Sequence, residues 1–470
     1  MKFLLFTALA AAATLSAAAE GDTFPPLISA GDVTARGAAI QRTMTLLETS
    51  AVEKKNRVRV LFYGQSITEQ DWWKEVHRDL LKRFPLAKLE VENLAIGGHA
   101  AQLLEKTAEA DLYPWQPDLV IFHVYGAHDS YERIVRRIRE RTSAEVIIQT
   151  DHLGAKDLLD EPTSNLKQEQ WNPWINYSFL PATAKKYGCE LLPVRDMWKA
   201  YLRENKLEPR ALLKDDVHLN AQGSFLMAEA VKSGLVYRRD DKTDAWSGLV
   251  KEVTLTDASW KEDTLTVEFD GNRVDGVWGG TAGVSAAGGA ASLRIDGKPP
   301  EELRQMFTFT RTTAYDGTNW PCLLRVQRGS AQLVEEEWTI TLAHATPDYQ
   351  RFLFSVTGSK TGPDGIGSAR KKFVSKSKRI VIEPDDWNLQ FAQRTFGRRL
   401  PEGFRITFKS VPQWDTLPLG SGTFVKGLLN GKHTLELSGA GIRRSGLTGL
   451  LIYRPTFPQT EDPAADKSAE

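Results

Sequence analysis

Apolar and polar residues follow one pattern up to about residue 235 and another beyond it. In the first part, short runs of consecutive apolar residues alternate with segments whose apolar positions recur every three or four residues. Such runs are typical of strands buried on both faces, and such segments of amphipathic helices. The expected strands are 58–63, 89–95, 117–125, 146–150 and 190–194, and the expected helices are 38–47, 71–84, 130–141, 171–187 and 197–204. This alternation predicts an α/β fold with helices on both faces of a parallel sheet.

A charged linker at residues 237–242 ends this pattern, and the helical period disappears after it. Short segments with alternating apolar residues follow, separated by turn sequences such as Asn430-Gly431 and Asp364-Gly365. The expected strands are 253–255, 264–269, 338–342, 379–382, 404–408 and 433–437. We therefore predict a C-terminal all-β region of one or two sandwich-type modules.

The N-terminus has the features of an export signal. Lys2 precedes an apolar stretch, residues 3–15, that is too short to span a bilayer, and small residues follow up to Ala19. The sequence thus predicts a signal peptide and a periplasmic or extracellular protein. The remaining predicted boundaries are an N-terminal leader at 20–57, an α/β domain at 58–240, a β-rich region at 250–458 and a disordered tail at 459–470.

Composition narrows the possible partners. Lys+Arg and Asp+Glu both total 60, which gives no basic footprint for nucleic acid or an anionic membrane, and no later segment is apolar enough to span a membrane. Cys189 and Cys322 fall in different predicted domains, so we expect both to be unpaired. The histidines lack zinc-like spacing, and Asp364 among glycines is typical of a turn. We expect no metal and no cofactor.

Four short segments with reactive or turn-forming residues come at or near the ends of expected elements. They are residues 64–68, 93–98, 126–129 and 215–223. In an open parallel sheet, ligands bind outside the carboxyl ends of the strands, so these segments should meet at one edge. The sequence therefore predicts a reaction site there.

The residue types in these segments suit nucleophilic catalysis. Ser66 needs a base, which His218 can be, and a carboxylate must orient the imidazole. Asp215 is three residues before His218 and is preferred over the adjacent Asp216 because it can reach the far ring nitrogen. An oxyanion would need N–H donors, which the backbones of Ser66 and Gly98 can supply, with Gly97 the alternative to Gly98.

These segments resemble the GDSL/SGNH hydrolase family over about residues 58–235. The family's blocks are Gly-Asp-Ser, a glycine after the second strand, Gly-x-Asn-Asp and Asp-x-x-His. The resemblance implies a flavodoxin-like three-layer α/β/α domain and ester hydrolysis through an acyl-enzyme. It also implies a triad of Ser66, His218 and Asp215, with Gly98 as a backbone oxyanion donor.

Two positions depart from the family pattern. Gln65 replaces the usual aspartate, and Gly-Gln-Ser resembles the variant in carbohydrate acetylesterases of this superfamily, which implies an O-acetyl substrate on carbohydrate. His128 stands in place of the asparagine that donates to the oxyanion. A histidine ring N–H can take that role, but His128 could also contact substrate or cap a helix. For Asp129 we expect an N-cap of the helix at 130–141.

Several alternatives stay open. Asp151 and His152 are adjacent on extended chain, so they should point to opposite faces and not form a dyad. The enzyme could be a lipase or thioesterase for longer acyl chains. The His128 substitution also fits a catalytically silent glycan-binding protein, and the seven tryptophans beyond residue 240 could include stacking platforms for sugars. Our preferred prediction is an exported, metal-independent serine esterase that acts on a small-molecule or polysaccharide ester.

Overall fold

The computed structural model describes residues 24–28, 33–239, 247–279, 291–416, 422–443 and 445–459. The expected signal peptide lies outside the described residues, as does all but the first residue of the expected tail. Among the described residues, no helix is both long enough and apolar enough to cross a membrane.

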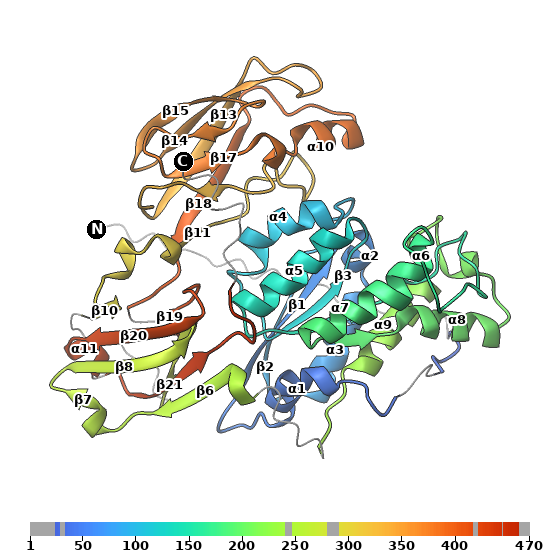
Figure 1. Ribbon diagram of the computed structural model, residues 1–470, viewed down its shortest axis with the longest axis horizontal. Coiled ribbons are helices and arrows are strands. Elements are labelled where there is room, and N and C mark those ends of the chain that lie inside the picture. Colours follow the sequence, from blue (N-terminus) through green and yellow to red (C-terminus); the bar gives the residue numbers. More distant parts are fainter. Residues whose placement is uncertain are drawn as a thin grey trace, which may run out of the picture.

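A five-stranded parallel sheet forms the centre of the α/β domain (Figure 1). Its strand order is β2-β1-β3-β4-β5, the flavodoxin-like order of doubly wound folds. Every neighbouring pair is parallel, and each strand ends within two residues of its expected bounds. The strands are β1 (Arg57–Gly64), β2 (Lys88–Asn93), β3 (Leu119–His123), β4 (Glu145–Gln149) and β5 (Glu190–Leu192). The predicted fold class is confirmed.

Helices cover both faces of this sheet, and each face has its own apolar core. Successive residues of a strand point to opposite faces, so Val60 packs in one core and Leu61 in the other. Helices α4, α5 and α7 lie on the Leu61 face, and α1, α3, α8 and α9 on the Val60 face. Their bounds are α1 (Gln41–Glu48), α2 (Ser66–Glu69), α3 (Trp72–Arg83), α4 (Ala101–Asp111), α5 (His128–Arg141), α6 (Trp171–Trp174), α7 (Leu180–Tyr187), α8 (Val194–Glu204) and α9 (Ala221–Gly234).

The helix predictions were wrong in two places. The pattern did not indicate α4, whose inward face includes small residues such as Ala101 and Ala108. The helix expected at 171–187 is interrupted by a π-helical turn, η2 (Ile175–Phe179), between α6 and α7. Pro181 sits in the first turn of α7 and has no N–H to donate to the preceding turn, which explains the changed hydrogen-bond pattern.

The β-rich region contains two bodies of strands (Figure 1). The terminal sandwich, as we call it, pairs a sheet β10-β20-β8-β7 with a sheet β19-β9-β21-β6. Its strands come from both ends of the region. They are β6 (Val250–Thr254), β7 (Trp260–Lys261), β8 (Thr264–Gly271), β9 (Arg273–Trp278), β10 (Ser292–Ile295), β19 (Thr423–Val425), β20 (Gly431–Ser438) and β21 (Leu447–Tyr453), and a short helix α11 (Ala440–Arg443) follows β20.

The inserted sheets, β11 to β18, lie in sequence between β10 and β19. Their orders are β11-β18-β13-β14-β15 and β12-β17-β16. The strands are β11 (Phe307–Phe309), β12 (Gln327–Arg328), β13 (Glu336–Ala343), β14 (Leu353–Gly358), β15 (Gly362–Ser368), β16 (Phe373–Val374), β17 (Ile380–Ile382) and β18 (Arg405–Pro412). This part also contains α10 (Leu389–Phe396), so the expectation that helices are absent after the linker was wrong.

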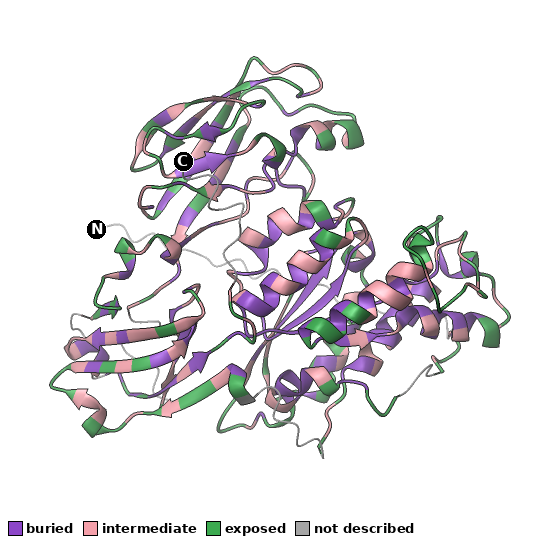
Figure 2. Ribbon diagram, viewed as in Figure 1, coloured by how far each residue is buried: buried purple, intermediate pink, exposed green. Residues whose placement is uncertain are grey.

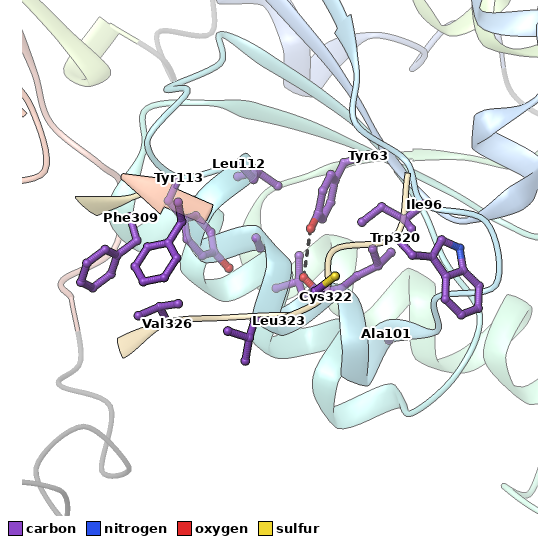
Figure 3. Close-up of a cluster of buried hydrophobic side chains, with 14 of the residues drawn as sticks. Tyr63, Ile96, Ala101, Leu112, Tyr113, Phe309, Trp320, Cys322, Leu323 and Val326 are labelled. Atoms are coloured by element: carbon purple, nitrogen blue, oxygen red, sulfur yellow. Dashed lines mark hydrogen bonds between the residues drawn. The ribbon is translucent and has the colours of Figure 1, made fainter. Parts of the chain in front are cut away.

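One apolar core runs from the α/β domain into the inserted sheets. The Leu61 face of the parallel sheet packs in the same cluster as Trp338 and Phe408 of the inserted sheets. Figure 3 shows Tyr63 and Leu112 of the α/β domain in one cluster with Cys322 and Leu323. Figure 2 shows the parallel sheet as the buried centre of its domain. The predicted division into separate domains stays a prediction, although this core is shared.

The two cysteines are buried, unpaired thiols. Burial raises the pKa of the Cys189 thiol to about 12 and raises that of Cys322 further still. Both therefore remain protonated and pack as small apolar side chains.

Candidate active site

Ser66 lies on the sharp turn that joins β1 to α2 at the carboxyl edge of the sheet. Gln65 is still extended and Ser66 is the first helical residue. A side chain at Gly64 would collide with the carbonyl oxygen of His123 and with Thr68, so the turn requires glycine. The serine is half-buried. Its hydroxyl thus sits at the edge where ligands of open parallel sheets bind.

Three predicted residues are joined by hydrogen bonds. The Ser66 Oγ is 2.9 Å from His218 Nε2, and His218 Nδ1 is 2.8 Å from Asp215 Oδ2. The other carboxylate oxygen of Asp215 accepts from the backbone N–H groups of His218 and Val217, at 2.7 and 2.8 Å. The bond from the His218 backbone contributes most to holding the pKa of Asp215 below its ordinary value. An ionised Asp215 accepts the Nδ1 proton, which leaves Nε2 free to accept from Ser66.

The loop that carries His218 is fixed at several points. Gln70, just after α2, accepts from the Leu219 N–H at 3.0 Å and donates to its carbonyl at 2.8 Å. His152 donates from Nε2 to the carbonyl of Val217 at 2.7 Å. Asn220 caps α9 by accepting from the N–H of Gly223 at 3.0 Å. Sequence reasoning did not find the roles of Gln70 and His152, because they contact the backbone of a remote segment.

Asp216 points away from the relay. Its Oδ1 is 2.7 Å from Arg210 Nη1, and that hydrogen bond contributes most to lowering its pKa. The structure therefore brings Asp215, and not Asp216, to the imidazole. Both residues are in one loop, and only the folded path of the loop separates them.

Gln65 contacts the serine hydroxyl, and proton counting fixes the direction of that contact. Ser66 Oγ lies 2.6 Å from Gln65 Oε1, while the buried Gln65 Nε2 has no hydrogen-bond partner within the described ranges. Ser66 has one proton, and with Nδ1 protonated toward Asp215 that proton goes to His218 Nε2. The amide must then present its NH₂ group to Oγ, the orientation obtained by exchanging its oxygen and nitrogen.

The second glycine segment forms a tight turn beside Ser66. His99 N–H closes the turn on the carbonyl of Ile96 at 3.2 Å, and Gly98 has a φ of +76°, as the third position of a type II turn requires. A Cβ at Gly97 would lie 3.5 Å from the Ser66 Cβ and would collide with the Glu69 carboxylate. A Cβ at Gly98 would instead lie 2.5 Å from the Trp320 ring. The donor role of Gly98 stays a prediction.

His128 begins α5 and contacts aromatic rings. Its Nε2 is 2.8 Å from Asp129 Oδ1, and its ring lies 5.4–5.9 Å from those of Trp171, Trp174 and Phe179. No hydrogen bond in the described part of the chain joins it to Ser66, and its oxyanion role stays a prediction. Asp129 is in the first turn of α5, and the N-cap is Ala127, so the expected cap was wrong. The helix starts two residues earlier than expected.

Asp151 and His152 make separate contacts and no dyad. Asp151 accepts from His123 Nε2 at 3.0 Å and from Asn176 at 3.0 Å. Burial acts to raise the pKa of Asp151, but the hydrogen bonds from His123 and Asn176 and the nearby Arg195 charge together outweigh it, and the pKa is lowered. Burial lowers the pKa of His152 to about 4, so its ring is neutral at pH 7. Asp151, just after β4, thus binds His123 at the end of β3.

No group of three or more His, Cys, Asp or Glu within the described ranges is arranged to hold a metal ion. The α/β domain thus has a parallel sheet in flavodoxin-like order, with serine, histidine and aspartate in relay at its carboxyl edge. This is the arrangement that the resemblance to GDSL/SGNH hydrolases implies.

Comparisons with known proteins add structural likeness over part of the chain. No protein family model and no curated protein matches the sequence. A GDSL-like lipase candidate from Parabacteroides merdae is 15% identical over 39% of this chain and 98% of its own, with a TM-score of 0.33. The acetyl xylan esterase AlAXEase is 21% identical over 38% of this chain and 100% of its own, with a TM-score of 0.32. An acetylxylan esterase from Geobacillus stearothermophilus is 17% identical over 39% and 97%, with a TM-score of 0.33. At these identities and TM-scores the likeness assigns no substrate or reaction to this chain.

Proposed function

We propose that this protein is a serine esterase that removes O-acetyl groups from carbohydrate through an acyl-enzyme. The observation that carries the proposal is the relay from Ser66 through His218 to Asp215, with distances of 2.9 and 2.8 Å. A serine hydroxyl, an imidazole and a carboxylate in this order make up a nucleophile, its general base and the group that orients the base.

The proposed reaction has two halves. Ser66 Oγ attacks the ester carbonyl carbon as its proton passes to His218 Nε2, and the imidazolium is stabilised by Asp215. The tetrahedral oxyanion accepts from backbone N–H groups of Ser66 and Gly98, and His128 is the proposed side-chain donor. The sugar hydroxyl leaves with the proton from His218. Water, deprotonated by the same imidazole, then releases acetate and restores Ser66.

The substrate class and the location belong to the same proposal. Support for acetyl groups on carbohydrate comes from Gly64-Gln65-Ser66 and its resemblance to carbohydrate acetylesterases. Support for export comes from Lys2 and the apolar stretch after it. Amino-terminal sequencing of protein recovered outside the cytoplasm tests export, and a mature chain that starts near residue 20 is expected.

A covalent label tests the nucleophile. Treatment with a fluorophosphonate should add one adduct to the peptide that contains Ser66, detected by mass spectrometry, and Ser66→Ala should give neither adduct nor turnover. An adduct on another serine contradicts the assignment. A wild-type chain with no adduct and no ester cleavage, but retention on a glycan column, favours the silent binding protein.

Aryl esters of increasing chain length and acetylated oligosaccharides test the substrate class. We expect kcat/KM to be highest for the two-carbon ester and acetate to be released from the acetylated sugar. A preference for eight or more carbons overturns the acetylesterase proposal in favour of a lipase or thioesterase.

A further inference from the structure

One loop of the β-rich region leaves its own sheets and lies against the active site. The loop, residues 315–323, follows β11 and reaches the turn that contains Gly97 and Gly98. Figure 3 shows Trp320 of this loop close to Ile96, the first residue of that turn, at one end of the shared core. The contact joins segments that are more than 200 residues apart in sequence.

Trp320 packs directly on the glycine turn. A Cβ at Gly98 would lie only 2.5 Å from the indole, so the Gly98 backbone lies against the ring without room for a side chain. Trp320 is 5% exposed. Its ring packs against the rings of Phe391 and Phe396 of α10, with both centroid distances 4.8 Å. The indole is therefore a fixed surface for the turn.

The residue after Gly98 is held by the same region. The His99 ring meets Trp320 edge-on at 4.6 Å, and its Nε2 lies 3.4 Å from Asn388 Nδ2. Burial lowers the pKa of His99 to about 4, so the ring is neutral at pH 7. Two residues of the β-rich region thus contact the turn: Trp320 packs on Gly98, and Asn388 lies beside His99.

Asn319 makes an exposed polar contact beside the site. Its Nδ2 donates to Glu69 Oε1 at 2.6 Å. Glu69 is at the end of the short helix that Ser66 begins, and its other carboxylate oxygen lies beside Gly97. An amide and a carboxylate, both exposed and next to the nucleophile, offer donors and acceptors to the hydroxyl groups of a sugar.

We infer that the β-rich region is part of the active site: Trp320 positions the Gly97–Gly98 turn for the oxyanion, and Asn319 with Glu69 forms a sugar-contacting wall. The inference rests on the proposed function. Oxyanion donors act only within about 2.7–3.1 Å of the developing charge, and a misplacement of about 1 Å can cost on the order of 100-fold in rate. A turn made of two glycines is flexible, so a rigid neighbour has a large effect on it.

Trp320 variants test the positioning role. Trp320→Ala should lower kcat on an aryl acetate about 10- to 100-fold, with KM within about threefold, and slow labelling of Ser66 by fluorophosphonate to a similar extent. Trp320→Phe, which keeps an aromatic surface, should recover most of kcat. Trp278→Ala is the matched control, because this indole packs on Phe424 in the terminal sandwich, which has a core of its own; its kcat should stay near wild type.

Each outcome decides for or against the inference. A folded Trp320→Ala chain with wild-type kcat and labelling rate overturns the positioning role, as does an equal loss in Trp278→Ala. Should Trp320→Ala not fold, Trp320→Leu keeps the apolar volume and carries the same expectation. A wild-type chain that neither cleaves esters nor reacts with fluorophosphonate defeats the proposed function itself, whereas active variants in an active background defeat only this inference.

Asn319 variants test the sugar-contacting wall. Asn319→Ala and Glu69→Gln should raise KM for an acetylated xylo-oligosaccharide about 3- to 10-fold, equivalent to one lost hydrogen bond of about 1 kcal/mol, and raise KM less for an aryl acetate, which has no sugar hydroxyl groups. Gln350→Ala, which removes an exposed amide elsewhere in the inserted sheets, should change neither value. Equal KM values for the oligosaccharide in Asn319→Ala and wild type contradict the wall.

Discussion

The terminal sandwich and the inserted sheets are attached to the α/β domain in different ways. The sandwich has a core of its own and contacts the domain through polar bonds, such as Asn272 Nδ2 to the carbonyl of Arg141 at 2.9 Å and Lys426 Nζ to that of Pro114 at 2.6 Å. The inserted sheets share an apolar core with one face of the parallel sheet, and the Arg311–Asp111 ion pair crosses the same boundary at 2.7 Å.

This difference teaches which part of the β-rich region can affect catalysis. A shared close-packed core transmits changes in volume, because its side chains have few voids in which to relax. A polar contact between two separate cores does so far less. The inserted sheets should therefore be coupled to the carboxyl edge of the parallel sheet, and the terminal sandwich should be largely independent of it.

The largest expected effect lies in the relay, which the α/β domain supplies alone. Asp215→Asn should lower kcat on the order of 10³- to 10⁴-fold, because an amide at this position no longer stabilises the imidazolium or fixes its tautomer. Asp216→Asn removes a neighbouring carboxylate that pairs with Arg210, and should keep kcat within about twofold. Steady-state kinetics on an aryl acetate measure both. A comparable loss in the two variants would mean that Asp216 shares the orienting role.

Matched core substitutions compare the two β bodies directly. Ile406 of β18 and Leu435 of β20 are both fully buried, one in the shared core and one in the sandwich core. Truncation to alanine should cost about 2–5 kcal/mol of local stability in each case. Only Ile406→Ala should lower the temperature at which esterase activity is lost on heating. Calorimetry follows unfolding in parallel, and an equal drop in the activity midpoint for Leu435→Ala would contradict the comparison.

Two buried histidines should make the stability of the folded chain sensitive to acid. His152 lies within the α/β domain, and His99 lies at its contact with the inserted sheets. His99 and His152 have pKa values lowered by burial to about 4 from an ordinary 6.5, so the unfolded chain binds protons that the folded chain does not. Their stabilising contribution is complete above pH 6.5 and is lost as the pH falls toward 4. The shift corresponds to roughly 3 kcal/mol for each ring.

Urea unfolding between pH 7 and 4.5 checks this expectation. The unfolding midpoint should fall over that range, and His99→Leu should make the fall shallower because the unfolded chain then gains one proton fewer. His99→Leu also removes a ring that contacts Trp320, which changes stability at every pH. The fall in the unfolding midpoint of this variant is therefore measured from its own midpoint at pH 7. An identical slope in the two chains would show that His99 is not the group that titrates.

The smallest expected effect concerns Gln65, inside the α/β domain. Gln65→Leu removes the amide group beside Ser66 Oγ and should lower kcat about fivefold, in line with the loss of one hydrogen bond of about 1 kcal/mol. Gln149→Leu, at the end of β4, replaces another buried amide and should leave kcat unchanged. Turnover of an aryl acetate, corrected for folded fraction, measures both. An unchanged kcat in Gln65→Leu would remove the amide from the reaction.

Local sequence was enough to find the α/β domain and the main parts of its site. The continuous apolar run before Gly64 marks a strand buried on both faces, and Gly64 marks the turn that no other residue fits. The order of Ser66, Asp215 and His218 along the chain also suggested the relay, because each falls at an expected sheet edge. Such signals depend only on residues close together in the sequence, so they can be recognised without the structure.

Tertiary structure decided which side chains meet at that edge. The sequence offered Asp215 and Asp216, or Gly97 and Gly98, as near equals, and the folded loops gave each a different neighbour. It gave no sign that Trp320 would lie against Gly98, because this contact depends on packing between segments more than 200 residues apart. Periodicity shows which face of an element is apolar, but only packing determines what that face covers.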